Sequence, residues 1–158
     1  MKKAMCAAAI TVALLSTTGV VAQDKGPHDK AIKARQSLMQ LYNFNLGILG
    51  DMAKGDVDYN AEAAQAAADN LLAAVSMNQG AMWPAGSDSE NAANRKNRAK
   101  PVIWENFPKV AEAGKAAFTA ATAMQGAAGN GLDSLKGAMG DVGKSCKGCH
   151  DDFRAERK

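Results

Sequence analysis

A single apolar seam near the C-terminus constrains the fold of this chain more than any other feature. Its side chains recur at alternating steps of three and four residues: Leu132, Leu135, Met139, Val142, Cys146, Cys149 and Phe153. Such steps keep side chains on one face of an α-helix, because the helix completes one turn in about 3.6 residues. The sequence therefore predicts a helix that begins near Leu132 and carries two cysteines on the face turned toward a core.

The first of three earlier helices is predicted from the same spacing. Its apolar stripe consists of Ile32, Met39, Tyr42, Leu46 and Leu49. Arg35 falls on the same face. We expect this helix to end between Gly50 and the Lys-Gly-Asp-Val-Asp segment at residues 54–58, since glycine and aspartate favour turns.

Two further helices follow. The second is rich in alanine, the best helix former, and is predicted from the N-cap residue Asn60 to about Met77. The third has Pro108 in its first turn, where a missing N–H costs nothing, and extends to about Gln125. No segment shows the alternation of a strand. The predicted fold class is all-α, an antiparallel four-helix up-down-up-down bundle.

Residues 78–100 have no apolar period and are predicted to form a long surface loop. We expect Trp83 in this loop to pack against the helices. The loop also holds the one basic cluster of the chain, which we interpret as solvated: Arg95, Lys96, Arg98 and Lys100.

Residues 1–22 have the features of a secretory signal peptide, with two lysines, an apolar run from Ala4 to Leu15 and small residues before the expected cleavage after Ala22. Residues 23–158 then form one domain, which we expect in the periplasm. The apolar run is shorter than the roughly 20 residues of a membrane-spanning helix, so no membrane span is expected. The leader contains two of the chain's 19 basic residues, and the basic residues that remain nearly balance the 16 acidic ones. We therefore expect no nucleic-acid partner.

Cys146, Cys149 and His150 form a C-x-x-C-H motif, the attachment site of a c-type haem. The thiols bind the haem as thioethers, and the histidine supplies a ring nitrogen to the iron. Because positions i, i+3 and i+4 share one helix face, the three groups point into one region. The sequence predicts one covalently bound haem c, with His150 as the proximal iron ligand.

Three alternatives explain the motif less well. A disulfide would close only a very short loop and leave His150 without a role. A thioredoxin-like pair follows a strand, whereas this motif lies late in a helix. A zinc site needs four ligands, and after the leader the chain offers only these two cysteines with His28 and His150.

The function of such a haem depends on the other axial position of its iron. The candidates after the leader are His28, Met39, Met52, Met77, Met82, Met124 and Met139. His28 precedes the apolar stripe, and we expect it to be exposed. Met39 lies in the middle of the inward stripe of the first helix, so it is the residue predicted to face the iron.

The chain contains R-Q-S-L-M at residues 35–39, P-V-I-W at 101–104, and G-D-V-G-K-S-C-K-G-C-H-D-D-F-R at 140–154. With these motifs, essentially all of the chain after the leader resembles the class II c-type cytochromes, the cytochromes c′ and their low-spin relatives. The resemblance implies a left-handed four-helix bundle with the haem near one end. It also implies that Met39 is the distal residue, that Arg35 pairs with a haem propionate, and that Arg154 lies near the proximal imidazole.

Members of this family differ at the distal residue. In cytochromes c′ an apolar side chain blocks an open sixth position that binds nitric oxide or carbon monoxide, whereas in the low-spin relatives a methionine sulfur binds the iron. Met39 favours a low-spin His/Met cytochrome, a periplasmic single-electron carrier between redox proteins and not an enzyme. The alternative is a five-coordinate high-spin cytochrome c′ in which Met39 only packs over the iron. A haem-free bundle with a disulfide is a third hypothesis, and both a monomer and a homodimer are compatible with the sequence.

Overall fold

The computed structural model describes residues 26–92 and 96–156, so the predicted signal peptide lies outside the described residues. Within them are four long helices: α1 (Asp29–Lys54), α2 (Ala61–Val75), α4 (Phe107–Ala127) and α5 (Leu132–Phe153). A 3-10 helix, η1 (Gly80–Met82), and a one-turn helix, α3 (Val102–Glu105), lie between α2 and α4. Within these described residues, every helix is too short or too polar to span a bilayer.

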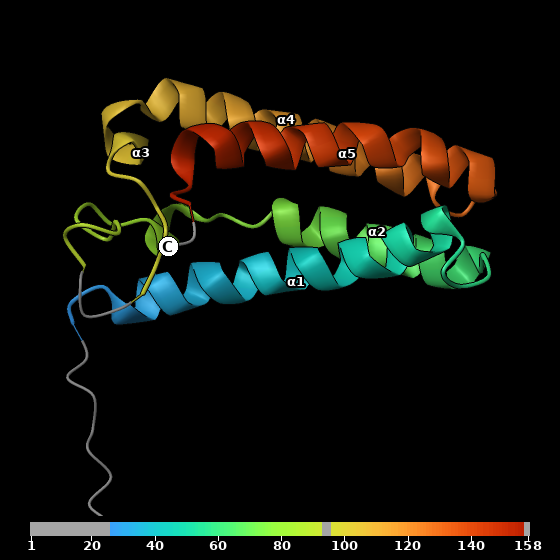
Figure 1. Cartoon of the computed structure of the whole chain (residues 1–158), viewed down its shortest axis with the longest axis horizontal. Helices are drawn as coiled ribbons and strands as arrows, with labels where there is room; N and C mark the ends of the chain where they lie inside the picture. The colour runs from blue at the N-terminus through green and yellow to red at the C-terminus, as the bar shows by residue number, and fades with distance from the viewer. Residues whose placement is uncertain (1–25, 93–95, 157–158) are drawn as a thin grey trace, which may run out of the picture.

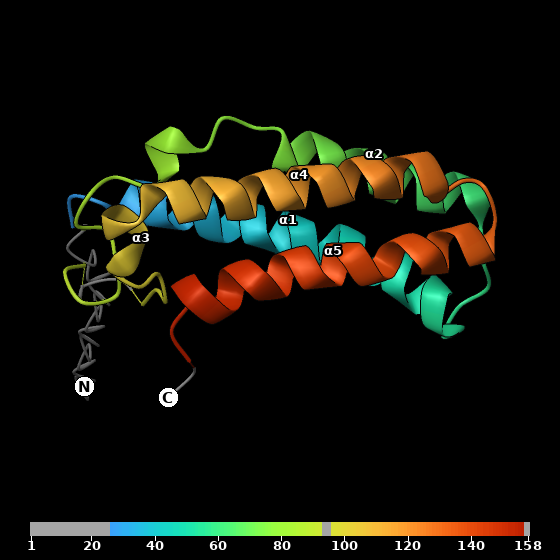
Figure 2. The same ribbon diagram turned by 90° about the horizontal axis from the view of Figure 1, so that it is seen from above.

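The four long helices form an antiparallel bundle. Helices α1 and α2 make one layer and α4 and α5 the other, and Figure 1 shows the two layers along the same long axis. Contacts of α1 with α5 and of α2 with α4 close the ring. Figure 2 shows the α1–α2 and α4–α5 links at one end, and the beginning of α1 near the end of α5 at the other. The predicted all-α up-down-up-down bundle is confirmed.

Local sequence explains where the helices begin and end. Helix α1 continues through Gly50 and ends at Lys54, because Gly55 adopts the left-handed conformation with φ 83° and closes the last turn. Helix α2 begins after Asn60, whose side chain accepts a hydrogen bond from the backbone N–H of Ala63 at 2.8 Å. It ends at Val75, slightly before the predicted end at Met77.

A dense apolar core fills the half of the bundle where α1 ends and α5 begins. Its buried residues are Leu49, Met52, Ala64, Ala67, Ala68, Leu71, Ala120, Ala121, Met124, Ala128, Leu135 and Val142. Half of these are alanines, whose small side chains let α2 and α4 approach closely. Tyr42, Leu46 and Cys146 are only partly buried at the margin of this core. The densest packing of the chain's own side chains therefore stops at the level of the first cysteine.

Because alanines line the contact between α2 and α4, a larger side chain at one of these positions should not fit. Ala68 of α2 is 0% exposed, so Ala68→Leu should overpack the core and lower the free energy of unfolding by about 1–3 kcal/mol. Ala66→Leu on the same helix is the matched control, because Ala66 is exposed and the change should stay within about 0.5 kcal/mol. Urea denaturation of the purified proteins measures both, and equal midpoints would contradict this packing.

A buried carboxylate organises the segment between α2 and α3. Asp88 is 2% exposed, and its Oδ1 accepts hydrogen bonds from the backbone N–H groups of Glu90 and Asn91, both at 2.8 Å. Its Oδ2 accepts one from the Asn91 side chain at 2.9 Å. Burial by itself raises the pKa of Asp88, but these hydrogen bonds outweigh burial, and the pKa lies below the usual aspartate value. The predicted surface loop is thus held by buried polar contacts.

Asp88 should make stability depend on pH. Because its pKa is lower in the folded chain than in the unfolded chain, its contribution is present above the unfolded pKa and is lost as pH falls through the folded pKa. Asp88→Asn should cost about 1–3 kcal/mol at pH 7, and the difference from the parent protein should shrink on acidification below about pH 4. Denaturation curves at several pH values measure this, and a difference that does not change with pH would contradict it.

Candidate haem site

The last two turns of α5 bring the three predicted haem residues together. Cys146, Cys149 and His150 are each half-buried, and both cysteines are free thiols. Phe153, one turn from Cys149 and His150, is buried at 5% exposure. Figure 1 shows that this part of α5 lies at the end of the bundle where α1 begins and α3 is found. The predicted motif therefore lies on a packed helix, beyond the dense core.

The surroundings of His150 favour the neutral form of its imidazole. Burial lowers the pKa of its imidazole, and the cations of Arg154 and Arg98 lower it further, against a raising effect of Asp151. A lowered pKa keeps the imidazole neutral at pH 7, with a ring nitrogen able to act as a ligand. This environment suits the role of proximal ligand.

The thiol of Cys149 differs from that of a redox-active cysteine. Burial raises its pKa, and Cys146 and Asp152 raise it further. Reactive thiol pairs depend on a lowered pKa that supplies the thiolate. The environment of Cys149 therefore does not support the thioredoxin-like alternative.

Two surface pockets adjoin the motif. One, of about 260 Å³, is lined by Arg98, Lys100, His150, Asp151, Arg154, Ala155 and Glu156. The other, of about 290 Å³, lies between α4 and α5 at Cys149, and small residues line part of it: Ala113, Ala116 and Gly148. His150 and Cys149 therefore reach the surface through different pockets.

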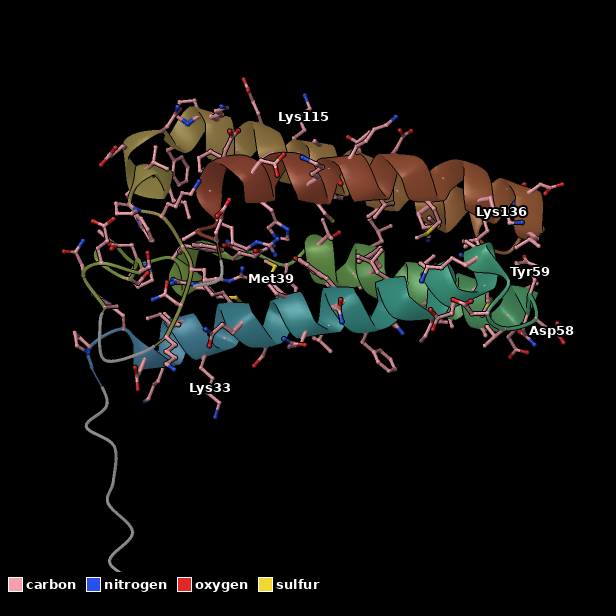
Figure 3. The ribbon with its side chains drawn as sticks, viewed as in Figure 1. Lys33, Met39, Asp58, Tyr59, Lys115 and Lys136 are labelled. Carbon is pink, nitrogen blue, oxygen red and sulfur yellow. The ribbon has the colours of Figure 1, made fainter. Side chains whose placement is uncertain are left out.

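Met39 comes to the site from α1. Figure 3 shows its side chain directed from α1 toward the layer of α4 and α5, whereas Lys33 points away from the bundle. Met39 is half-buried, and Leu38 beside it is buried at 3% exposure. The structure therefore places Met39 on the inner side of α1, as its stripe predicts.

Tyr42, one turn after Met39, joins this part of α1 to α2 and to the segment before η1. Its hydroxyl donates to the carbonyl of Ala74 at 3.3 Å and accepts from Gln79 Nε2 at 2.9 Å. Burial raises the pKa of Tyr42, the hydrogen bond from Gln79 lowers it, and the nearby Cys146 raises it. Tyr42 and Cys146 also pack against the same core, so this stretch of α1 lies near the first cysteine of α5.

The other candidate axial residues lie elsewhere or have other partners. Met52 and Met124 are in the dense core, Met139 packs against it, and Met77 is 49% exposed. Met82 of η1 is half-buried near α1, where its carbonyl accepts from Arg35 at 3.2 Å. His28 is half-buried, although we expected it to be exposed. Its imidazole lies beside Gly86, so that a side chain at position 86 would begin 3.5 Å from His28 Nε2. Met39 and Met82 are therefore the two methionines that remain as candidates for the second axial position.

Arg35 is buried at 4% exposure and donates hydrogen bonds to residues of the 82–97 region. Its guanidinium carbon lies 4.7 Å from the ring centroid of Trp83. Trp83 packs on Trp104 with centroids 6.4 Å apart, and Trp104 Nε1 donates to the Trp83 carbonyl at 3.1 Å. The prediction that Trp83 packs against the bundle is confirmed. The pairing of Arg35 with a propionate stays a prediction.

Sequence reasoning missed the place of Arg98 and Lys100. Both were expected in a solvated loop, but both are half-buried and line the pocket of His150. Arg154 lines the same pocket, and its backbone N–H donates to the His150 carbonyl at 3.1 Å. No local sequence pattern predicts that Arg98 and Lys100 lie near His150, because about fifty residues separate them in the chain and only folding brings them together.

These residues fit a covalently bound haem. Two free thiols and an imidazole lie close together near the end of α5, and the first thiol lies at the margin where the dense core stops. Met39 and Tyr42 approach from the opposing helix. The donor set is the one that a c-type haem requires, with both thioether positions and one nitrogen ligand supplied by one short segment.

Comparisons with known proteins agree with this site. A family model described as Cytochrome C' matches residues 30–154. Cytochrome c-554 of Cereibacter sphaeroides is 39% identical over 94% of this chain and 95% of its own. A solved cytochrome c′ from Rhodobacter sphaeroides is 34% identical with a TM-score of 0.79, covering 82% of this chain and 98% of that one. A nitric oxide complex of a cytochrome c′ variant from Alcaligenes xylosoxidans is 28% identical with a TM-score of 0.69, covering 82% and 97%.

The family match includes the four helices of the bundle except the first residue of α1, and it includes every residue of the predicted site. It also agrees with the resemblance seen in the motifs at residues 35–39, 101–104 and 140–154. The chain therefore belongs to the cytochrome c′ family of class II c-type cytochromes, and it carries one covalently attached haem c.

Proposed function

We propose that this protein is a cytochrome c′ in which His150 is the proximal iron ligand and Met39 packs over the other axial position, where nitric oxide or carbon monoxide binds. The place of Met39 carries the proposal: it lies on the inner side of α1, half-buried and facing the layer that contains α5. The relatives support this function better than the low-spin His/Met prediction, since the family model and both solved structures are of cytochromes c′.

When bound, the haem supplies an iron that exchanges one electron and takes an axial ligand. Cys146 and Cys149 tether it to α5, and the neutral imidazole of His150 offers the ring nitrogen. Arg154 adds positive charge beside that imidazole, and Arg35 is proposed to pair with a propionate in addition to its bonds within the chain. The side chain of Met39 limits the size of what reaches the distal face.

An electron carrier with Met39 as the sixth ligand is the second candidate. The specific observation in its favour is a sulfur, rather than an aliphatic group, on the inner face of α1 at this place. A soft thioether suits reduced haem iron and raises its potential. In that case the partners are other redox proteins of the periplasm, and no substrate is turned over. Both candidates are compatible with a monomer or a homodimer.

Optical spectra separate the two candidates. The proposal expects a high-spin ferric spectrum and a Soret band of the reduced protein that shifts when carbon monoxide is added. Met39→Ala should leave the spin state unchanged and speed the binding of carbon monoxide, because a smaller side chain opens the distal face. A low-spin spectrum with a near-infrared methionine band, and no response to carbon monoxide until Met39 is replaced, would overturn the proposal in favour of the electron carrier.

Met82→Leu is the matched control for Met39, since both methionines are half-buried near the start of the bundle. Its spectrum and its carbon monoxide kinetics should equal those of the parent protein. If Met82→Leu rather than Met39→Ala changed them, Met82 would be the residue over the iron, and the assignment of Met39 would be wrong.

The tether gives a separate prediction. After export from a host that matures c-type cytochromes, the purified polypeptide should gain the mass of one haem, and this mass should stay bound on denaturation because the links are covalent. The double replacement of Cys146 and Cys149 by alanine should release the haem on denaturation. Mass spectrometry measures both. A parent polypeptide with two free thiols or a disulfide, and no added mass, would contradict the site.

A further inference from the structure

One short segment, residues 96–100, touches both helices that carry the proposed axial residues. We propose that Asn97 is a positioning residue, which holds this segment on Arg35 of α1 and thereby fixes Arg98 beside His150 of α5. The inference rests on the proposed ligation by His150 and concerns the charge near that ligand. Asn97 itself lies outside the three residues that bind the haem.

Arg35 is the fixed point of this arrangement. Its Nη1 donates to Ser87 Oγ at 2.7 Å and to the carbonyl of Met82 at 3.2 Å, while its Nη2 donates to the carbonyl of Ser87 and to Asn97 Oδ1, the latter at 3.2 Å. The ring of Trp83 covers one face of the guanidinium. Burial lowers the pKa of Arg35 and the nearby Asp88 raises it. An arginine side chain remains a cation in proteins. A planar cation held at both terminal nitrogens has few other orientations.

The amide of Asn97 connects this cation to the following residues. Its Oδ1 accepts from Arg35 and also from the backbone N–H of Ala99 at 3.1 Å, and its Nδ2 donates to the carbonyl of Asp88 at 3.1 Å. Two donors meet the oxygen and a carbonyl meets the nitrogen, which fixes the orientation of the amide. Aspartate lacks the donor and alanine lacks both groups, so neither can replace these contacts.

The residues after Asn97 then pair with the end of α5. Ala99 and Arg154 form an antiparallel bridge, in which Lys100 N–H donates to the Phe153 carbonyl at 3.0 Å and Ala155 N–H donates to the Arg98 carbonyl at 2.8 Å.

Lys100 Nζ caps the last turn of α5 by donating to the carbonyls of Asp151 and Asp152, each at 3.1 Å. Arg98 Nη1 donates to the Ala155 carbonyl at 3.4 Å. Both cations thereby reach the pocket that His150 lines.

A cation beside the proximal ligand favours the reduced iron, because reduction lowers the positive charge at the metal. Arg98 and Lys100 lie in a pocket that also contains Arg154, with Asp151 and Glu156 as opposing charges. The pocket is open to solvent, so the effect of each charge is screened and depends on its distance. A residue that fixes that distance influences the reduction potential without contributing a charge.

The test is a double-mutant cycle on the haem-loaded protein, with the midpoint potential measured by optical titration. Arg98→Gln should shift the potential to more negative values, and Arg98→Lys should restore most of it. Asn97→Ala, which changes no charge, should shift the potential in the same direction. The shift caused by Asn97→Ala should be smaller in the Arg98→Gln background, because the charge that Asn97 positions is then absent.

Tyr59→Phe is the control for a merely structural effect. Tyr59 joins the far ends of the helices, with its hydroxyl donating to the Ala128 carbonyl at 2.8 Å and accepting from Gly131 N–H at 2.9 Å. This change should lower stability but leave the potential unchanged. Hydrogen exchange gives a second measurement: the amides of Lys100 and Ala155 should exchange faster in Asn97→Ala than in Tyr59→Phe.

Equal shifts from Asn97→Ala in both Arg98 backgrounds, or no shift in either, would overturn the inference. If Asn97→Ala does not yield loaded protein, Asn97→Ser is the replacement, and the same cycle and exchange rates decide. A parent protein without haem absorbance would instead contradict the proposed function. The two failures are therefore distinguishable.

Discussion

The coincidence of two patterns on α5 is the constraint on which the rest of the structure depends. The spacing of three and four residues that packs a helix on a core also places Cys146, Cys149 and His150 on one face. The haem proposed to bind there would be attached where apolar side chains would otherwise continue the seam. One face of α5 would then serve both to hold the cofactor and to pack on the core, and the other three helices surround that face.

The bundle divides its stability between two halves accordingly. Alanines bring α2 and α4 together in the half away from the motif, and this dense packing fixes the relative positions of all four helices. In the other half, polar contacts of the segment between α2 and α3 take over, with Asp88 and Arg35 buried. Buried polar groups that are hydrogen-bonded specify one arrangement more than they add stability. A single, well-defined arrangement of side chains suits a haem site, because the chemistry of the iron depends on the groups around it.

Much of this could be predicted from the sequence. The helix periods, the N-cap at Asn60, Pro108 in a first helical turn, and the C-x-x-C-H motif are local signals. The periods and helix starts gave the four helices and the bundle class, and the motif predicts the haem residues of α5. The inward position of Met39 also follows from a local period. Burial of Arg35 could not be predicted, since an arginine on an apolar stripe is compatible with solvent when its partners are unknown. Arg98 and Lys100 were assigned to solvent for the same reason.

The sequence by itself determined the elements and the cofactor, because helix period, capping and thioether chemistry act over a few neighbouring residues. Only the tertiary structure decided what surrounds the site. Arg35 meets Asn97, and Arg98 meets Ala155 just after α5, through hydrogen bonds between residues far apart in the chain. Their spacing carries no period, and the free energy of each contact depends on a partner that folding alone brings near.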